Sequence, residues 1–294
     1  METFFQKVAR NLNWLGITRF FVRKTFLFFE RYLRIHITPV DYFSPIPNVS
    51  ALDPQVFEKI FDDTGLQWNV DGQLAFLNEA AAKYSSEYLP QPNDGLSQAD
   101  AFILYAMIRE KKPRLMIEVG SGESTKISLM ALAKNREEGI ECSFHAIEPY
   151  PRDHLRKIST PWFTLVEKKL EDVEIDFLVQ ADLLFIDSSH VAKIGSDVIC
   201  EMLEIVPKLK MGAVIHWHDI MLPMNYWKDW THTGTQFWNE SYMLHAFLLF
   251  NEAYRVVWAS RYMHLTHASD IAAGIPSFQP ETHRITSFWL QRVK

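Results

Sequence analysis

From residue 114 onward the chain alternates short apolar runs with helical stretches, and this rhythm limits its possible folds more than any other feature. The clearest helical stretches are Thr125–Arg136 and Ile194–Leu209. Short apolar strands that alternate with helices indicate a parallel sheet covered on both faces. The expected strands are Leu115–Val119, Ser143–Ile147, Phe163–Val166, Asp182–Ile186 and Ala213–His216. The sequence therefore predicts a doubly wound α/β domain.

The flanking segments complete the predicted organisation. After the fifth strand we expect a helix over 235–251, and two strand-like runs, AYRVVWAS and TSFWLQRV, follow it. Before the sheet, the segment 52–88 is expected to be helical with an interruption near GLQWNVDG, and a further helix ends at Pro113. The predicted boundaries are an N-terminal helix at 1–40, a linker and helical cap at 41–97, and the sheet domain at 98–294.

Composition narrows the class of protein. The 294 residues carry a formal net charge of −6, which argues against a general nucleic-acid binder. The two cysteines, Cys142 and Cys200, cannot form a disulfide framework or a CxxC metal motif, and we interpret both as packing residues in a cytoplasmic protein. No segment is apolar over the roughly 20 residues that span a bilayer, and charges interrupt the N-terminus, unlike in a signal peptide.

The N-terminal segment 14–35 is a basic amphipathic helix rich in aromatic residues. Its six charged residues cluster on one side of a helical projection, opposite most of its apolar residues. Such a helix can lie in a membrane interface. It can equally pack on its own domain or form a homodimer interface.

The turn after the first strand points to a nucleotide-like ligand. In IEVGSGEST the glycines are not followed by the Gly-Lys-Ser/Thr of a P-loop, and Thr125 replaces the third glycine of the dinucleotide fingerprint. Glu118 and Glu123 flank the turn, and carboxylates disfavour a pyrophosphate. S-adenosylmethionine carries a sulfonium and an ammonium group and no phosphate, so these carboxylates attract it. Glu148, at the end of the next strand, is placed to accept ribose hydroxyls.

Four motifs carry a family resemblance. In order, IEVGSGEST, AIEP, ADLLFIDSSH and GAVIHWHDI resemble a class I S-adenosylmethionine-dependent methyltransferase over roughly residues 98–294. Within that class the chain looks closest to the branch of macrocin and related sugar and polyketide O-methyltransferases. The resemblance implies a Rossmann-like, mostly parallel sheet of seven strands whose last pair is an antiparallel hairpin.

The resemblance also implies roles for individual residues. Glu118, Gly120, Ser121 and Gly122 would wrap the methionine part of the donor, and Glu148 would hold its ribose. An acidic residue after the third strand, Asp172, would lie near the adenine.

The chemistry of methyl transfer to a hydroxyl requires a base or a metal ion. Asp187, His190, His218 and Asp219 all follow strand ends and can supply either. His190 can act as a base near neutral pH, with Asp187 and His218 as further catalytic candidates. Asp187, His218 and Asp219 can hold a divalent ion, and a histidine ligand moves the preference from Mg²⁺ towards Mn²⁺, Zn²⁺ or Fe²⁺. His216, by contrast, is expected to be a packed residue.

The sequence thus predicts an S-adenosylmethionine-dependent methyltransferase whose acceptor is a sugar, glycolipid or secondary-metabolite hydroxyl. The aromatic loop 221–238 either covers the acceptor or is only tacked onto the body by buried tryptophans. The rival functions are an NAD-dependent oxidoreductase on a similar sheet and a binding or scaffold protein without turnover. We expect no nucleic-acid partner for this protein. Peripheral membrane contact through residues 14–35 stays open.

Overall fold

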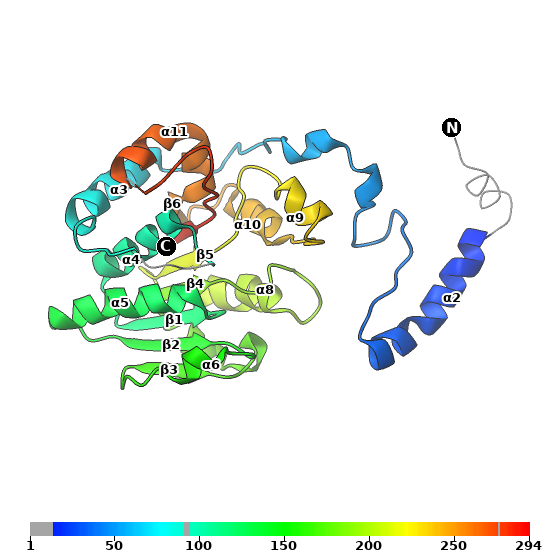
Figure 1. The fold of residues 1–294 in the computed structure, drawn as a ribbon, viewed down its shortest axis with the longest axis horizontal. Coiled ribbons are helices and arrows are strands. Elements are labelled where there is room, and N and C mark those ends of the chain that lie inside the picture. Colours follow the sequence, from blue (N-terminus) through cyan, green and yellow to red (C-terminus); the bar gives the residue numbers. More distant parts are fainter. Residues whose placement is uncertain (1–13, 91–94, 276) are drawn as a thin grey trace. The chain divides into compact units, whose positions relative to one another are not determined.

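The computed structural model describes residues 14–90, 95–275 and 277–294, and its internal contacts divide the chain into two units. The first unit comprises residues 1–56 and 227–237, and the second comprises 57–226 and 238–294. The predicted sheet lies entirely within the second unit (Figure 1).

A single seven-stranded sheet organises the second unit. Its strands are β1 (Leu115–Val119), β2 (Ser143–Ile147), β3 (Phe163–Val166), β4 (Leu183–Ile186), β5 (Val214–Trp217), β6 (Tyr254–Ala259) and β7 (Phe288–Arg292), in the order β3-β2-β1-β4-β5-β7-β6. The first five strands are parallel, and β7 runs antiparallel to both β5 and β6. The prediction of a mostly parallel, Rossmann-like seven-stranded sheet is confirmed, and the strand order reverses between β1 and β4.

Helices cover both faces of the sheet. One face carries α3 (Val70–Tyr84), α4 (Gln98–Lys111), α5 (Glu123–Glu137) and α11 (Ser260–Gly274). The other carries η4 (Leu170–Asp172), α7 (Ile175–Leu178), α8 (Asp197–Cys200), η5 (Glu201–Ile205), η6 (Val206–Lys208) and α10 (Glu240–Leu248). A short helix, α6 (Asp153–Arg156), follows β2. The element α8, the π-helical η5 and the 3-10 turn η6 together fill the predicted helix 194–209.

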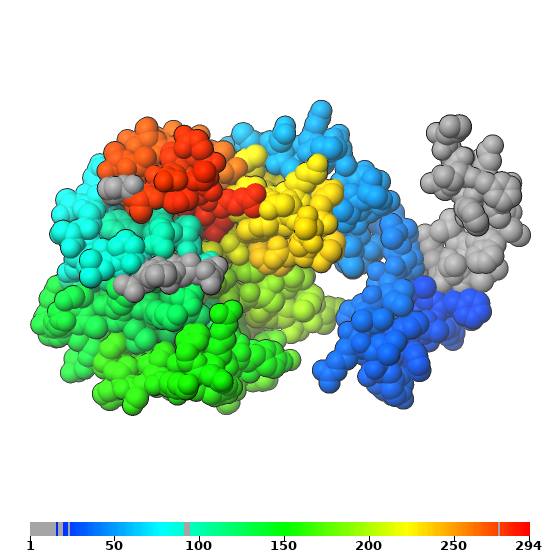
Figure 2. Space-filling model, in the orientation of Figure 1, coloured from blue at the N-terminus to red at the C-terminus, as the bar shows by residue number. Residues whose placement is uncertain are grey.

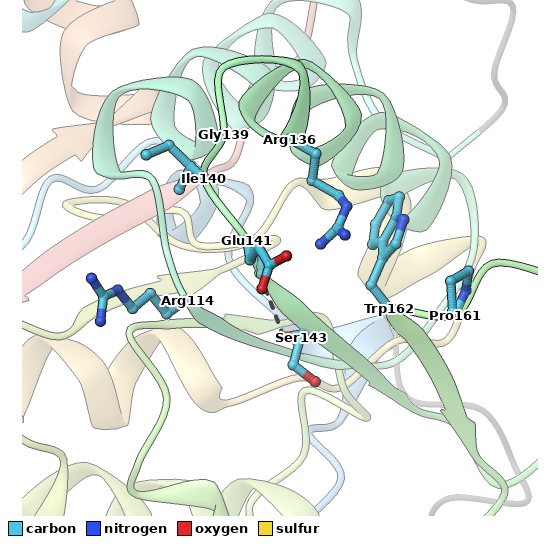
Figure 3. A pocket seen from close by; sticks show the side chains of 9 residues that line it. Arg114, Arg136, Gly139, Ile140, Glu141, Ser143, Pro161 and Trp162 are labelled. Carbon is cyan, nitrogen blue, oxygen red and sulfur yellow. Dashed lines mark hydrogen bonds between the residues drawn. The ribbon is translucent and has the colours of Figure 1, made fainter.

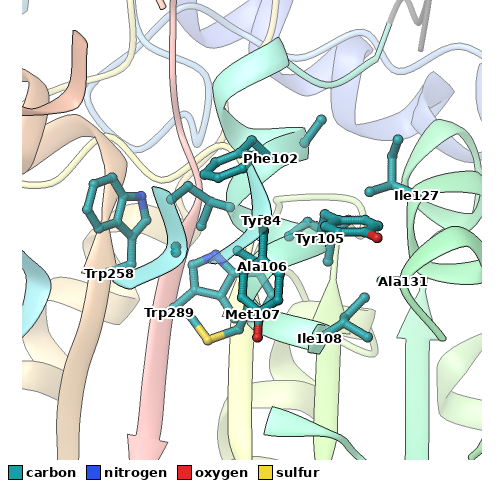
Figure 4. Close-up of a cluster of buried hydrophobic side chains, with 14 of the residues drawn as sticks. Tyr84, Phe102, Tyr105, Ala106, Met107, Ile108, Ile127, Ala131, Trp258 and Trp289 are labelled. Atoms are coloured by element: carbon teal, nitrogen blue, oxygen red, sulfur yellow. The ribbon is translucent and has the colours of Figure 1, made fainter. Parts of the chain in front are cut away.

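Strand alternation divides the apolar side chains between two cores. Along β1, Met116 belongs to the core under α4 and α5, whereas Ile117 belongs to the core on the opposite face. Figure 4 shows the first core, which contains Trp258, Trp289 and side chains of α4 such as Met107. Both indoles are 0% exposed, and each such buried side chain contributes roughly 1.5–3 kcal/mol to the free energy of folding. This packing fixes the strand ends that carry the candidate site.

The N-terminal helix of the first unit is described from Trp14 onward, and residues 1–13 of the predicted segment 1–40 lie outside the described residues. In the described part, α2 (Trp14–Phe28) continues into one π-helical turn, η1 (Phe29–Leu33), and Arg34 adopts a left-handed conformation. The chain then turns back, so that the His36 ring stacks on Phe26 with centroids 5.1 Å apart. The space-filling view draws this segment in dark blue (Figure 2). The first unit also contains η2 (Val49–Ala51) and α9 (Lys228–His232).

Some predicted elements were wrong in extent. Within residues 52–64 the only helical element is the 3-10 turn η3 (Pro54–Phe57), because Asp53 and Asp62 accept hydrogen bonds from nearby backbone N–H groups and so compete with helix formation. The helix α3 instead begins inside the predicted interruption. The helix α10 is shorter than predicted at both ends, and α11, between the last two strands, was not predicted.

Two further predictions concern cysteines and membranes. Cys142 and Cys200 are both buried and unpaired by any disulfide, and burial raises the pKa of the Cys142 thiol to about 12, as expected of a packing residue. Among the described residues, every helix is too short or too polar to cross a bilayer.

Candidate active site

The candidate site lies at the carboxyl ends of β1, β2, β4 and β5. The backbone N–H of Gly120 donates to the carbonyl of Ile147, and that of Asp187 donates to Val119. These hydrogen bonds extend the strand ladder by one residue beyond each strand. The polar residues that follow the strands are therefore held at one edge, beside the reversal of strand order where ligands bind in such sheets.

Two adjoining cavities occupy this edge. One of about 480 Å³ is lined by residues that include Tyr150, Leu170 and Lys193, and one of about 270 Å³ lies against the glycine turn. Gly120, Glu148 and Asp187 line both, so the two form one cleft. Its size falls in the range typical of small-molecule sites.

Gly120 allows the backbone to pass very close to β4. Its φ of +78° lies in the left-handed region, and an added Cβ would sit 1.9 Å from the Asp187 carbonyl oxygen. Only glycine fits such a position. Gly122, in contrast, is extended and has nothing within 4 Å of an added Cβ, which leaves open space over the turn.

Glu118 is fully buried beneath the turn. Ser124 Oγ donates a hydrogen bond to its Oε1, while Oε2 has no partner among the described residues. Burial raises the pKa of this carboxyl to about 8. The hydroxyls of Ser124 and Thr125 lower the pKa, whereas the nearby charges of Asp187 and Glu148 raise it further. A buried carboxyl oxygen without a partner is costly, and a cationic group brought close to it would supply one.

Glu148 stands at the entrance of both cavities. Its Oε2 accepts from the Ser121 N–H at 3.3 Å and its Oε1 from the Tyr150 N–H at 2.8 Å. Each carboxylate oxygen keeps a further lone pair, so both can accept a ligand hydroxyl. The ribose-binding role of Glu148 stays a prediction.

Asp172 is not brought to the cleft. The short helix η4 that contains it places Glu171 and Leu170 on the wall of the larger cavity instead. A 3-10 helix has three residues per turn, so the side chains of successive residues point about 120° apart. Adjacent acids therefore face different directions, and sequence alone does not tell which faces the ligand.

His190 connects the cleft to the protein interior. It is buried, its Nδ1 lies 2.9 Å from Glu240 Oε2, and its Nε2 lies 3.3 Å from Asp187 Oδ1. Burial lowers the pKa of the ring, but the hydrogen bonds with Asp187 and Glu240 outweigh it and raise the pKa well above the usual 6.5. Its ring also lies 4.3 Å from that of Trp238. His190 is thus held between the carboxyl groups of Asp187 and Glu240.

The Glu240 carboxyl is the partner of His190 on the Nδ1 side of the ring. It is fully buried in α10, and burial raises its pKa, while the hydrogen bond from His190 acts in the opposite direction. Glu201 in η5 is also fully buried, and burial together with the charge of Glu240 raises its pKa well above the usual value. Two neighbouring buried carboxyls resist ionising together.

Asp187, His218 and Asp219 form a compact group of three. Their potential ligand atoms all lie within 4.8 Å of one another, and His218 Nδ1 is 3.2 Å from Asp219 Oδ1. Burial lowers the pKa of His218, but the charges of Asp219 and Asp187 outweigh it and raise the pKa to about 9. Thr286 Oγ1 donates to Asp219 at 3.0 Å. One nitrogen and two carboxylates are a suitable donor set for a divalent transition metal.

Two residues at this edge of the sheet have strained backbone conformations. His190 and Asp219 adopt φ values of +59° and +56°, which are uncommon for residues other than glycine. Such strained residues persist where surrounding structure holds them, and they concentrate at functional sites.

His216 is a packed residue, as predicted. Its side chain is fully buried, stacks on Phe185 with centroids 4.0 Å apart, and lies 3.2 Å from Ser287 Oγ. Burial and, secondarily, the charge of His218 hold its pKa well below 6.5, so it stays neutral.

A further cavity lies elsewhere. About 810 Å³ in volume, it is lined by Arg114, Arg136, Ser143 and Trp162 at the amino ends of β1, β2 and β3 (Figure 3). The Arg136 guanidinium stacks over Trp162 at 5.5 Å. Because ligands of open parallel sheets bind at the carboxyl ends of strands, this cavity is separate from the candidate active site.

Comparisons with known proteins agree with the geometry. Residues 117–220 match the model of a methyltransferase domain family, and this segment contains every predicted donor-binding residue and the Asp187–His218–Asp219 group. Together with the sheet, the match supports a class I S-adenosylmethionine-dependent methyltransferase. An uncharacterised protein of Archaeoglobus fulgidus is 29% identical over 160 residues, covering 47% of this chain and 71% of the relative.

Solved structures give more distant likenesses. A Podospora anserina methyltransferase bound to S-adenosylhomocysteine is 13% identical with a TM-score of 0.43, covering 76% of this chain and 88% of that one. An O-methyltransferase of tomaymycin synthesis from Streptomyces achromogenes, in complex with S-adenosylmethionine, is 14% identical with a TM-score of 0.43, covering 76% and 89%.

Proposed function

We propose that this protein transfers a methyl group from S-adenosylmethionine to a hydroxyl of a sugar, glycolipid or secondary metabolite. One observation carries the donor assignment: the buried Glu118 Oε2 faces no partner in the described chain, directly under a glycine turn whose backbone approaches β4. The ammonium group of the donor supplies the missing positive partner. The bound donor contributes an electrophilic methyl group on a sulfonium.

The chain's own residues would then position and deprotonate the acceptor. Asp187 lines the donor cleft and contacts His190 at 3.3 Å, so the donor and the histidine share one boundary residue. Glu240 holds Nδ1 of His190 and thereby directs Nε2 toward the strand ends. Positive charge arriving in the cleft favours the neutral form of His190, which can accept the hydroxyl proton.

A metal ion offers the alternative means of activating the hydroxyl. Asp187, His218 and Asp219 would hold it, and the ion would supply Lewis-acid chemistry that lowers the pKa of the acceptor hydroxyl. His190 Nε2 already lies within 3.7 Å of Asp219 and 3.3 Å of Asp187, so protonated His190 and a cation compete for the same carboxylates. The two modes of activation are therefore distinguishable by experiment.

The test is methyl transfer from labelled donor to a panel of sugars, glycolipids and phenolic metabolites, with Mg²⁺, with Mn²⁺ and with EDTA. His190→Gln is compared with His267→Gln, a histidine on α11 away from the strand ends. Loss of a general base typically costs about 10²–10⁴-fold in rate. Turnover in EDTA that is lost only in His190→Gln supports the histidine mechanism, whereas absence of any labelled product across the panel contradicts the proposed acceptor class.

A further inference from the structure

The N-terminal helix exposes an unusual amount of apolar surface. Six bulky side chains within it are between 56% and 67% exposed, and they are Phe20, Phe21, Leu27, Phe28, Tyr32 and Leu33. Single exposed apolar residues are ordinary, but contiguous patches mark a binding surface. We call this set the aromatic patch.

The patch is an ordered face of the helix. Phe21, Phe28 and Tyr32 are spaced by seven and four residues and so lie on one side of it. The Phe28 and Tyr32 rings are 5.1 Å apart. A neighbouring stripe is half-buried, since the returning chain places His36 on Phe26. The fold of this unit thus covers one apolar stripe and leaves the aromatic patch open.

Cations are interleaved with the patch. Lys24 Nζ lies 5.7 Å from the centre of the Phe20 ring, and Arg31 follows Phe28 by three residues. The segment 14–35 holds five basic residues and a single acid, Glu30, whose carboxylate is 3.2 Å from His36. The chain as a whole nevertheless has a net charge of −6. Basic charge is therefore concentrated at the aromatic patch.

We propose that α2 and η1 dock this protein on a membrane surface that contains anionic lipid. The aromatic rings would enter the boundary between headgroups and acyl chains, while Lys24 and Arg31 meet the anionic headgroups. The helix lies in the interface, since within the described residues no helix can cross a bilayer. Pairing of two copies through the same face would bring like charges together, which favours an anionic lipid partner over a second chain.

The test is co-sedimentation of the full chain with vesicles of phosphatidylcholine alone and of phosphatidylcholine with 30% phosphatidylglycerol. We expect binding to the anionic vesicles that weakens with added salt. Replacing both cations, Lys24→Gln with Arg31→Gln, should lower the partition coefficient by on the order of twentyfold, since each surface cation is worth about fivefold. Phe21→Ser with Phe28→Ser should lower it at least as much.

The matched control is Leu203→Ser with Met211→Ser, which removes two exposed apolar side chains of the second unit and should leave vesicle binding unchanged. Hydrogen exchange of the unaltered protein gives an independent measurement, because docking should slow exchange of the amides of residues 20–33 only with anionic vesicles. Equal binding by all variants, absence of vesicle binding, or a dimer formed through this helix would each overturn the proposal.

Discussion

Replacing Glu118 by glutamine should stabilise the protein at alkaline pH and weaken its binding of S-adenosylmethionine. The carboxyl is fully buried, and burial raises its pKa from the usual 4.5 to about 8. Between these two values the unfolded chain loses the proton that the folded protein keeps. Stability that the protonated carboxyl provides at low pH is therefore lost as pH rises from 4.5 to about 8.

The size of the effect follows from the change in pKa. A rise from 4.5 to about 8 corresponds to roughly 5 kcal/mol at most, and relaxation around a buried charge reduces it, so we expect about 2–5 kcal/mol. Glutamine does not titrate. The free energy of unfolding of Glu118→Gln, relative to that of the original protein, should therefore rise by this amount between about pH 5 and pH 8.5.

The assay is urea unfolding followed by tryptophan fluorescence at both pH values, with Glu137→Gln as the control. Glu137 is on the same helix as Ser124, its side chain is 64% exposed, and it should show no such pH dependence. Donor affinity of Glu118→Gln should fall about 10- to 100-fold, because a hydrogen bond to a charged group contributes about 1.5–3 kcal/mol. A stability difference that is the same at both pH values would show that Glu118 does not change its protonation between them.

Three further predictions concern the same edge of the sheet. Gly120→Ala should destabilise the fold by more than about 1 kcal/mol and abolish donor binding, because the added Cβ would collide with the Asp187 carbonyl. Gly122→Ala should fold normally, and thermal unfolding and calorimetry compare the two variants. Glu240→Gln should lower kcat by about 10- to 100-fold with little change in donor affinity, because it loosens His190 without changing the cleft. Equal losses in kcat and donor affinity would contradict a positioning role for Glu240. Binding of Mn²⁺ should tighten by up to about tenfold per pH unit between pH 6 and 8.5, because His218, with a pKa of about 9, must release its proton to bind the ion; pH-independent binding, or binding retained in Asp219→Asn, would argue against this metal site.

The sheet could be predicted from sequence because its signals are local. The strands β1, β2 and β3 lie where the apolar runs predicted them, and β4 and β5 differ only by a residue at their ends. Residues that follow parallel strands must meet at one edge, so Glu118, Glu148, Asp187 and Asp219 could be grouped without coordinates.

The inner part of the site could not be predicted in this way. Glu240 contacts His190 across 50 residues of sequence, and it lies on a helix where an acid normally indicates a solvated surface. Glu201 is likewise hidden in a helical run. Their burial depends on how α10 and η5 pack against the sheet, which no local pattern records.

The helix α11 was missed for a related reason. Its residues show almost no separation of apolar and polar faces, and His267 departs from helical geometry within it. Contacts with α3 and β6 help to hold it in place, so tertiary packing rather than amphipathic periodicity decides its structure.

The most direct measurement of the central claim is calorimetric titration of the full chain with S-adenosylmethionine, S-adenosylhomocysteine and NAD⁺, each with Mg²⁺ and with EDTA. We expect micromolar binding of the first two ligands that is lost in Glu148→Ala, which removes both carboxylate oxygens from the cleft. Binding of NAD⁺ alone would contradict the assignment of the glycine turn, and binding of none of the three would indicate a protein that kept the fold without the donor site.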